Sequence, residues 1–170
     1  QVIEVQKAKK NNCLVGAAIG VNPKDLERAE ELTKVKADLI VIDTAHGHTQ
    51  KVLNMIKKIK KKLKNCTICA GNIATGKAAK FLADSGVDII KVGIGPGSIC
   101  TTRLVAGVGV PQLSAVLEVK KALKNYRTKI ISDGGIKFSG DLAKAIAAGA
   151  DAVMIGSLFS GTLESPGKII

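Results

Sequence analysis

The sequence predicts an α/β protein, a (β/α)8 TIM barrel of which about six of the eight βα units are present. Short apolar runs alternate with amphipathic stretches, which is the pattern of βαβ units in a parallel sheet. Polar residues and glycines follow nearly every apolar run, and barrels carry their chemistry at the carboxyl ends of successive strands. The first run ends at Ile19-Gly20-Val21-Asn22-Pro23, without the glycine-rich fingerprint of a doubly wound sheet.

Each element follows from its own pattern. The predicted strands are the apolar runs Leu14–Ile19, Leu39–Asp43, Cys66–Ala70, Ile89–Gly93, Lys129–Ser132 and Ala152–Ile155. The predicted helices are the amphipathic stretches Lys24–Val35, Gln50–Leu63, Gly76–Asp84, Pro111–Leu123 and Ser139–Ala148. The joints Ser85-Gly86-Val87-Asp88 and Ala148-Gly149-Ala150-Asp151 resemble each other, which indicates repeated units of one architecture.

Composition narrows the class of protein. The 170 residues are 46% hydrophobic and only 2% aromatic, which suits an aliphatic core packed close to the backbone. The formal net charge of +12 is typical of proteins that bind polyanions. Many lysines, however, fall in the stretch 57–64, the solvated face of a predicted helix, and no aromatic residues are interleaved there for base stacking. These features argue against a nucleic-acid partner.

The chain shows no apolar run of transmembrane length and no charged-then-apolar leader. We therefore expect a cytoplasmic protein without a membrane partner, and that location argues against disulfides among Cys13, Cys66, Cys69 and Cys100. Cys66 and Cys69 have CxxC spacing, but alternation along a strand would place them on opposite faces. Buried structural thiols are expected there, rather than a zinc or redox site.

The longest polar loop, residues 92–103, carries Cys100. Gly93, Gly95 and Gly97 free the backbone to turn its amides and carbonyls toward a ligand or ion. Ser98, Thr101 and Thr102 add hydroxyls. A thiol surrounded by backbone donors near Arg103 is expected to have a lowered pKa and to act as a nucleophile. The alternative is a tight turn around a small buried cysteine.

The last two predicted strands end in Ser132-Asp133-Gly134-Gly135 and Met154-Ile155-Gly156-Ser157. Loops at these positions of a barrel often form a phosphate site from backbone amides at a short helix. Gly135, Gly156 and Ser157 suit such a site, and Asp133 suits a ribose diol. The alternative is that the glycines only turn the chain while Asp133 caps a helix.

The second and third predicted strands also end in polar groups. Asp43 is interpreted as an acceptor for ribose hydroxyls, with His46 lining a pocket and His48 solvated. The two histidines alone do not make a metal site, because no third ligand is evident nearby. Asn72 either orients a substrate or caps the helix that we expect from Ala74.

These loops, in this order, resemble those of the inosine monophosphate dehydrogenase family. The matching segments are Val15–Ala18, Asp43–His48, Gly71–Thr75, Lys91–Gln112, Ser132–Ile136 and Gly161–Gly167. They cover nearly the whole chain after Asn12, and the Cys100 loop is highly specific. The resemblance implies one partial catalytic barrel over residues 1–170, in which Gln1–Lys10 is the helix after the second barrel strand.

The resemblance further implies NAD-dependent oxidation of inosine monophosphate (IMP) to xanthosine monophosphate, in guanine nucleotide biosynthesis. Cys100 would attack C2 of the hypoxanthine ring beside Thr102, hydride would pass to NAD, and the thioimidate would then be hydrolysed. The implied substrate-binding residues are Ser98, Asp133, Gly134, Gly135, Gly156 and Ser157. The implied cofactor-binding residues are Asp43, Thr44, Ala45, Asn72, Gly93 and Gly95. Carbonyls of Gly95, Gly97 and Cys100 would bind K⁺ as an activator, in a cytoplasmic homotetramer.

Three departures from the family pattern are evident. The flap that serves the hydrolytic step would lie beyond Ile170, the first two barrel strands would precede Gln1, and no room remains for the regulatory tandem (CBS-type) domain. Thr44 stands where Ser is usual, and Lys168 where Glu is usual. GMP reductase, an NADPH-dependent deaminating enzyme with the same barrel and thiol loop, is the main alternative function, and a non-catalytic barrel fragment is the other.

Overall fold

Six strands form one parallel sheet in the computed structural model, which describes residues 1–165; Pro166, Gly167 and Lys168 lie outside the described residues. The strands are β1 (Gly16–Ile19), β2 (Leu39–Asp43), β3 (Ile68–Ile73), β4 (Ile89–Val92), β5 (Lys129–Asp133) and β6 (Ala152–Met154). The helices are α1 (Val2–Lys10), α2 (Pro23–Lys34), α3 (Gln50–Lys62), α4 (Gly76–Ala83), α5 (Thr102–Val105), α6 (Gln112–Ala122), α7 (Ser139–Ala147) and a 3-10 turn, η1 (Ser157–Phe159).

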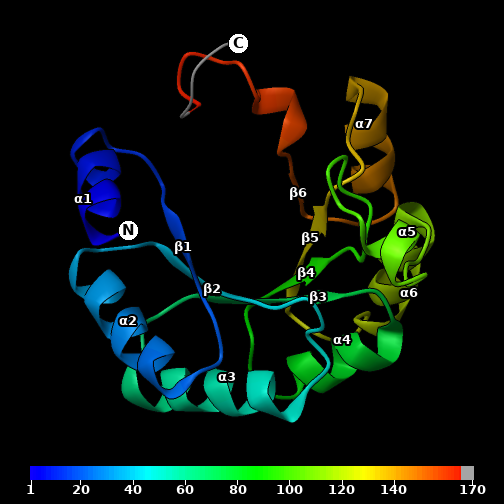
Figure 1. Cartoon of the computed structure of the whole chain (residues 1–170). Coiled ribbons are helices and arrows are strands. Elements are labelled where there is room, and N and C mark those ends of the chain that lie inside the picture. Colours follow the sequence, from blue (N-terminus) through cyan, green and yellow to red (C-terminus); the bar gives the residue numbers. More distant parts are fainter. Residues whose placement is uncertain (166–170) are drawn as a thin grey trace.

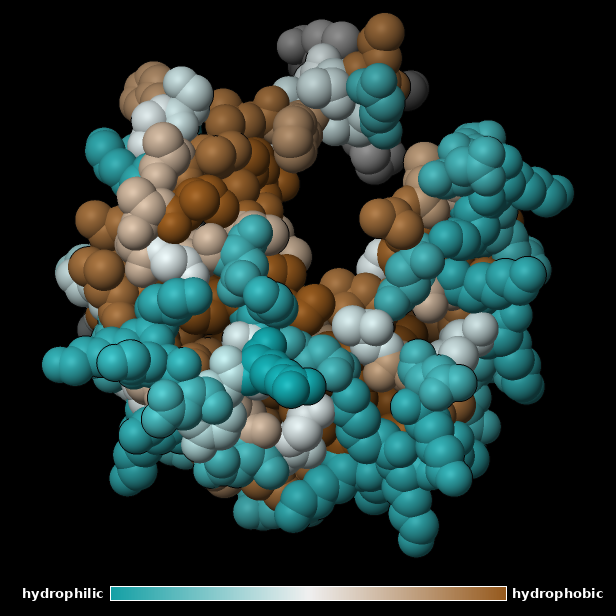
Figure 2. All heavy atoms as spheres, turned by 180° about the vertical axis from the view of Figure 1, so that it is seen from behind, coloured by the Kyte–Doolittle hydropathy of each residue, from teal (hydrophilic) through white to brown (hydrophobic). Residues whose placement is uncertain are grey.

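The sheet is curled like part of a barrel. Its strand order follows the chain order, and every neighbouring pair is parallel. Figure 1 shows the helices along the outer side of the sheet, with the curl open between β1 and β6. Figure 2 shows hydrophobic residues gathered around the hollow of the curl and hydrophilic ones on the outer helices. The predicted partial (β/α)8 barrel is therefore confirmed.

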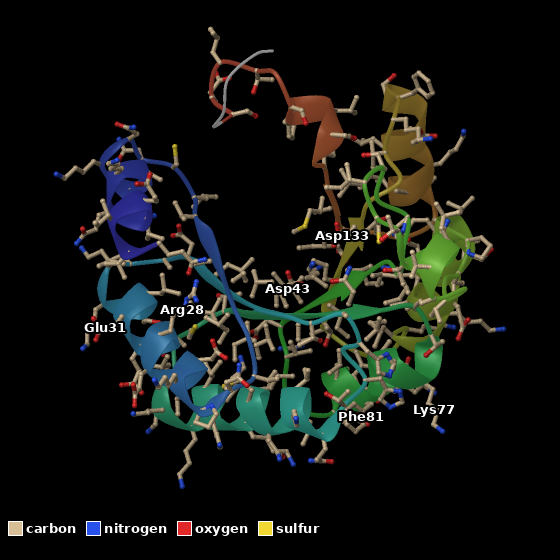
Figure 3. The ribbon with its side chains drawn as sticks, in the orientation of Figure 1. Arg28, Glu31, Asp43, Lys77, Phe81 and Asp133 are labelled. Atoms are coloured by element: carbon tan, nitrogen blue, oxygen red, sulfur yellow. The ribbon has the colours of Figure 1, made fainter. Side chains whose placement is uncertain are left out.

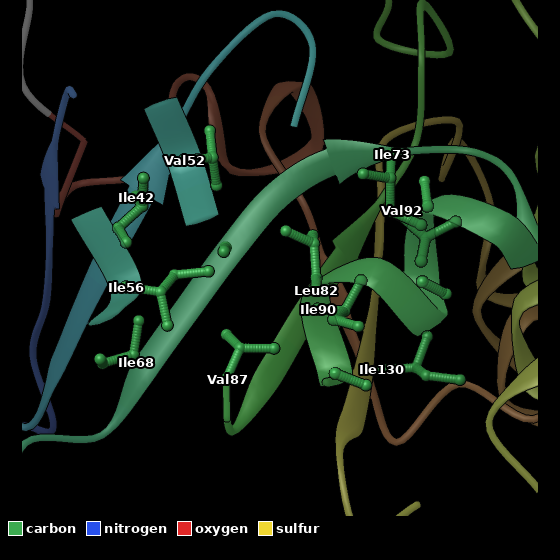
Figure 4. Close-up of a cluster of buried hydrophobic side chains, with 14 of the residues drawn as sticks. Ile42, Val52, Ile56, Ile68, Ile73, Leu82, Val87, Ile90, Val92 and Ile130 are labelled. Atoms are coloured by element: carbon green, nitrogen blue, oxygen red, sulfur yellow. The ribbon is translucent and has the colours of Figure 1, made fainter. Parts of the chain in front are cut away.

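The core lies between the sheet and its outer helices. Strand residues such as Ile42, Ile68 and Ile90 are fully buried, as are Ile56 of α3 and Leu82 of α4 (Figure 4). The largest fully buried side chains are all Leu, Ile or Val, as the composition predicted. Among residues 1–165, no helix combines the length and apolar character needed to cross a bilayer.

Two strand predictions were wrong by more than one residue. The first strand begins at Gly16 rather than Leu14, because the backbone N–H of Val15 donates to the Asp38 carboxylate (2.7 Å) instead of joining the ladder. The third strand is Ile68–Ile73 rather than Cys66–Ala70. Its start is delayed because Cys66 N–H still bonds Leu63 O in the turn after α3. Helix α5 was not predicted, since it lies inside the glycine-rich loop.

Aspartates tie the amino ends of the strands together. Asp38, Asp88 and Asp151 each lie directly before a strand. Each accepts a backbone N–H from a residue at or next to the start of the neighbouring strand that comes earlier in the chain. The donors are Val15 (2.7 Å), Ile68 (2.8 Å) and Ile130 (2.9 Å), respectively. Each carboxylate also pairs with a lysine: Lys9, Lys60 and Lys129. The similar joints in the sequence thus form a repeated structural contact.

Candidate active site

The polar residues at the carboxyl ends of the strands meet around one buried lysine, Lys91 of β4. Its side chain is only 7% exposed, and its Nζ lies 3.0 Å from Asp43 Oδ1 and 2.8 Å from Asp133 Oδ2. Burial disfavours the charged amine, but the ion pairs with both carboxylates outweigh it and raise the pKa of Lys91. Figure 3 shows Asp43 and Asp133 within the curl, whereas Arg28 lies on an outer helix.

Asn72 completes this network. Its Nδ2 donates to Asp133 Oδ2 (2.9 Å) and to Gly93 O (2.8 Å). Its Oδ1 is buried and has no partner within the described residues. The helix-capping alternative for Asn72 is wrong, because Thr75 accepts the N–H of Ala78 and caps α4. An amide held in this way can orient a ligand beside the two carboxylates.

Sequence reasoning placed Lys91 inside a matching segment but assigned it no role. The available signal was a lysine within the apolar run Ile89–Gly93, because a charge in a buried strand needs partners. Gln112 was missed in the same way. Its Nε2 donates to Val92 O (2.8 Å) and to Ser132 Oγ (2.9 Å), and so joins the ends of β4 and β5.

A cavity of about 330 Å³ opens beside Lys91. It is lined by Asp43, Thr44, Ala45, Asn72, Lys91, Gly93, Ile94, Gly95, Cys100 and Thr102. All six residues predicted to bind a cofactor are therefore brought together, next to the predicted nucleophile. We refer to this space as the first cavity.

A second cavity of about 410 Å³ lies between the Cys100 loop and the ends of β5 and β6. It is lined by Gly97, Ser98, Ile99, Asp133, Gly134, Gly135, Ile136, Met154, Ile155, Gly156, Ser157 and Ser160. All six residues predicted to bind the substrate are among them. The Asp133–Lys91 ion pair links this second cavity to the first.

The turn after β5 requires glycine. Gly134 and Gly135 have φ angles of +87° and +79°, in the left-handed region that other residues rarely adopt. A Cβ on Gly134 would also lie 3.0 Å from Pro96 Cγ and 3.1 Å from Gly97 N. The turn therefore packs directly against the Cys100 loop. Asp133 does not cap the following helix, because Asp141 accepts the N–H groups of Lys137 and Phe138 there.

Cys100 is exposed, so the alternative of a small buried cysteine in a turn is wrong. Its thiol donates to Thr102 Oγ1 over 3.3 Å. When the sulfur is ionised, the Thr102 hydroxyl and backbone N–H can donate to it instead, and these hydrogen bonds, with a smaller contribution from the Arg103 charge, lower the pKa of this thiol. Both cavities reach this loop, with Gly95 and Cys100 facing the first and Ser98 facing the second.

The other cysteines lack these surroundings. Cys69 is buried beneath the site, and burial raises the pKa of its thiol to about 12. Cys66 precedes β3 and is half-buried, and burial raises its pKa as well. Both are free thiols, but the expected burial is confirmed only for Cys69.

The histidines were placed wrongly. His46 is exposed and does not line the first cavity, although its neighbour Ala45 does. His48 is half-buried rather than solvated, because its ring packs edge-on against Phe81 with centroids 4.7 Å apart. Within residues 1–165, no group of three His, Cys, Asp or Glu residues is placed to hold a metal ion.

Comparisons with known proteins fit this geometry. A family model described as "IMP dehydrogenase / GMP reductase domain" matches residues 3–170. The chain belongs to this family. It is 56% identical over 164 residues to the inosine-5'-monophosphate dehydrogenase of Borreliella burgdorferi, and 55% identical over 171 residues to that of Streptococcus pyogenes. These alignments cover 96% and 99% of this chain but 41% and 35% of those relatives, so the chain spans less than half of their length.

The solved structures include the other branch of the family. The crystal structure of GMP reductase C318A from Trypanosoma brucei in complex with guanosine 5'-monophosphate has a TM-score of 0.90 and 50% identity. That match covers 92% of this chain and 33% of the reductase chain. The chain is therefore similar over nearly its whole length to both kinds of enzyme in this family, which share the barrel.

Proposed function

We propose that the protein oxidises IMP to xanthosine monophosphate with NAD, through a covalent intermediate on Cys100. The observation that carries the proposal is the position of this thiol. It is exposed, its pKa is lowered, and its loop separates a cavity suited to a nucleoside monophosphate from a cavity suited to a nicotinamide cofactor.

The second cavity is the proposed IMP site. Backbone N–H groups of Gly135, Gly156 and Ser157, with the Ser98 hydroxyl, would hold the phosphate, since donors from several chain segments converge there. Gly134 would let the β5 turn approach the ligand closely. Asp133 would accept the ribose hydroxyls, because Lys91 and Asn72 hold its Oδ2 from the other side. The base would then extend toward Cys100.

The proposed chemistry has two steps. The Cys100 thiolate forms a bond to C2 of hypoxanthine, and the C2 hydrogen leaves as hydride. Water then breaks the carbon–sulfur bond, which gives xanthosine monophosphate and regenerates the thiol. Thr102 supplies a hydroxyl next to the sulfur in both steps. Bound NAD would supply the hydride acceptor, and Asp43, Thr44, Ala45, Asn72, Gly93 and Gly95 of the first cavity would hold it.

A monovalent cation is a further part of the proposal. Carbonyls of Gly95, Gly97 and Cys100 lie on one loop, and Gly97 O already accepts the N–H of Cys100 (3.1 Å). A carbonyl oxygen has a second lone pair, so this contact leaves it able to bind K⁺. Activity measured in potassium should exceed activity in sodium several-fold, as an order-of-magnitude expectation from ordering of the loop. Equal rates in the two salts would remove this assignment.

The test uses the protein expressed from its full-length gene, supplied with IMP, NAD and potassium. NADH formation is followed, the reaction is quenched, and a purine adduct is sought on the peptide that contains Cys100. Cys100→Ala should abolish NADH formation, whereas Cys13→Ala, at another exposed cysteine, should not. Turnover without Cys100 would overturn the mechanism.

GMP reductase is the second candidate, favoured by the fold match to the Trypanosoma brucei enzyme. It predicts NADPH oxidation when GMP is supplied and no NADH formation from IMP. The segments Ala106–Gln112 and Glu164–Gly167 resemble the dehydrogenase branch more closely, which is why we place the reductase second. A cytoplasmic homotetramer is the proposed assembly, and sedimentation of the full-length protein tests it.

A further inference from the structure

Arg103 spans the two ends of the Cys100 loop. Its Nη2 donates to Val110 O over 2.6 Å, and its Nε lies 3.4 Å from Ile94 O. Ile94 is near the start of the loop and Val110 follows its end. One side chain therefore connects the backbone on both sides of the segment that contains the thiol.

The loop leaves room for the stem of Arg103. A Cβ placed on Gly95 or on Gly109 would lie 2.7 Å from Arg103 Cγ, so the side chain runs between the two glycines. Gly109 does not have a left-handed backbone, so a Cβ there would not strain the backbone but would force the Arg103 side chain to move. Gly95 in the loop and Gly109 beyond α5 thus leave space for the same arginine side chain.

We propose that Arg103 is a positioning residue that staples the ends of the Cys100 loop and thereby holds the Thr102 hydroxyl against the Cys100 sulfur. Arg103 follows Thr102 in the short helix α5, so fixing its side chain fixes that helix. The planar guanidinium carries donors at separate nitrogens and can bond two carbonyls together, which an ammonium on a flexible stem does poorly. In the sequence, Arg103 suggested only a positive charge near the thiol.

The test measures how the ionisation of the Cys100 thiol depends on pH, so it does not require turnover. The catalytic importance of this thiol rests on the proposed function. Iodoacetamide alkylation is followed across pH in the full-length protein, and the midpoint of the rate profile is recorded. A lysine-specific protease releases residues 92–120, which contain Cys100 and no other cysteine. Cys13, on a separate peptide, serves as the internal reference.

Gly109→Ala is the decisive variant, because it keeps the charge of Arg103 and removes the space for its stem. We expect it to move the alkylation midpoint of Cys100 upward, as Arg103→Ala and Arg103→Lys do. Alkylation at neutral pH, relative to each variant's own alkaline plateau, should fall about threefold or more, because less thiolate is present. Gly140→Ala is the matched control, since a Cβ there meets nothing within 4 Å.

An unchanged midpoint in Gly109→Ala would overturn the staple, even if Arg103→Ala shifts it, because charge alone would then explain the arginine. Recovery of the wild-type midpoint by Arg103→Lys would overturn it in the same way. If circular dichroism shows that Arg103→Ala does not fold, the alkylation midpoint of Gly109→Ala still tests the role of Arg103. A shifted midpoint in a protein that oxidises no IMP would support the staple and reject the proposed function, so the two failures are distinguishable.

Discussion

Aspartates at the two ends of the strands have different partners. At the amino ends, Asp38, Asp88 and Asp151 each accept a backbone N–H and pair with a half-buried or exposed lysine. At the carboxyl ends, Asp43 and Asp133 share one buried lysine, and neither side chain accepts a backbone N–H from residues 1–165. The first group joins strand to strand, whereas the second leaves carboxylate oxygens facing cavities.

The difference shows how one residue type serves stability at one end of the barrel and ligand binding at the other. A carboxylate that accepts a backbone N–H gives that N–H its hydrogen-bond partner, so removal of the carboxylate lowers the stability of the fold. A carboxylate held by a buried amine is fixed in place, while its remaining lone pairs stay free for a ligand. Matched substitutions at the two ends should therefore separate stability from activity.

The largest effect is expected from Lys91→Met. Removal of the buried amine leaves two carboxylates without their shared partner, which should destabilise the fold by about 2–3 kcal/mol. Displacement of Asp43 and Asp133 should lower kcat/KM on the order of a hundredfold. Lys129→Met is the matched control, because Lys129 pairs with Asp151 at the amino ends but is 66% exposed. Urea unfolding measures the change in stability, and steady-state kinetics measure the change in kcat/KM. Equal losses of kcat/KM in Lys91→Met and Lys129→Met would contradict the different roles of the two ends.

Asp133→Asn should act on one cavity only. The amide is expected to lower kcat/KM for IMP about tenfold, because it gives up a charge-assisted acceptor for Lys91 and for the ribose. Asp43→Asn, which alters the first cavity, should instead raise KM for NAD. Initial rates with each substrate varied in turn distinguish the two. The assignment of the cavities fails if Asp133→Asn changes KM for NAD alone.

The sequence allowed the fold to be predicted from local patterns, and it allowed the residues that line the two cavities to be named with the help of the family resemblance. Apolar periodicity located all six strands. Polar residues at strand ends indicated part of each set of lining residues, such as Asp43, Asn72 and Asp133, and the family resemblance supplied the rest. The Lys91 network could not be predicted in the same way. Its contacts join positions 42 and 48 residues apart, so they depend on which side chains the curl brings together. His48 was misjudged for the same reason, since Phe81 lies on a later helix.

Asp88→Asn should affect stability and leave activity unchanged. The carboxylate accepts Ile68 N–H and pairs with Lys60, but it is 40% exposed, so we expect a loss of about 1 kcal/mol in the free energy of unfolding. Its distance from both cavities predicts wild-type kcat and KM. Chemical denaturation and a turnover assay on the same preparation provide the measurement. A marked fall in kcat with unchanged stability would reverse the roles assigned to the two ends.

The smallest effect concerns pH. The hydrogen bond from Lys9 and the backbone N–H of Val15 hold the pKa of Asp38 below its usual value. A depressed folded-state pKa contributes stability that is present above the unfolded pKa, about 3.9, and is lost as pH falls through the folded value. The stability difference between wild type and Asp38→Asn should therefore shrink as pH falls below about 4. Lys9→Met should weaken this pH dependence, because it removes the first of the two donors. Urea midpoints across this range test the idea, and a difference that stays constant with pH would show that Asp38 ties the strand through its shape and not its charge.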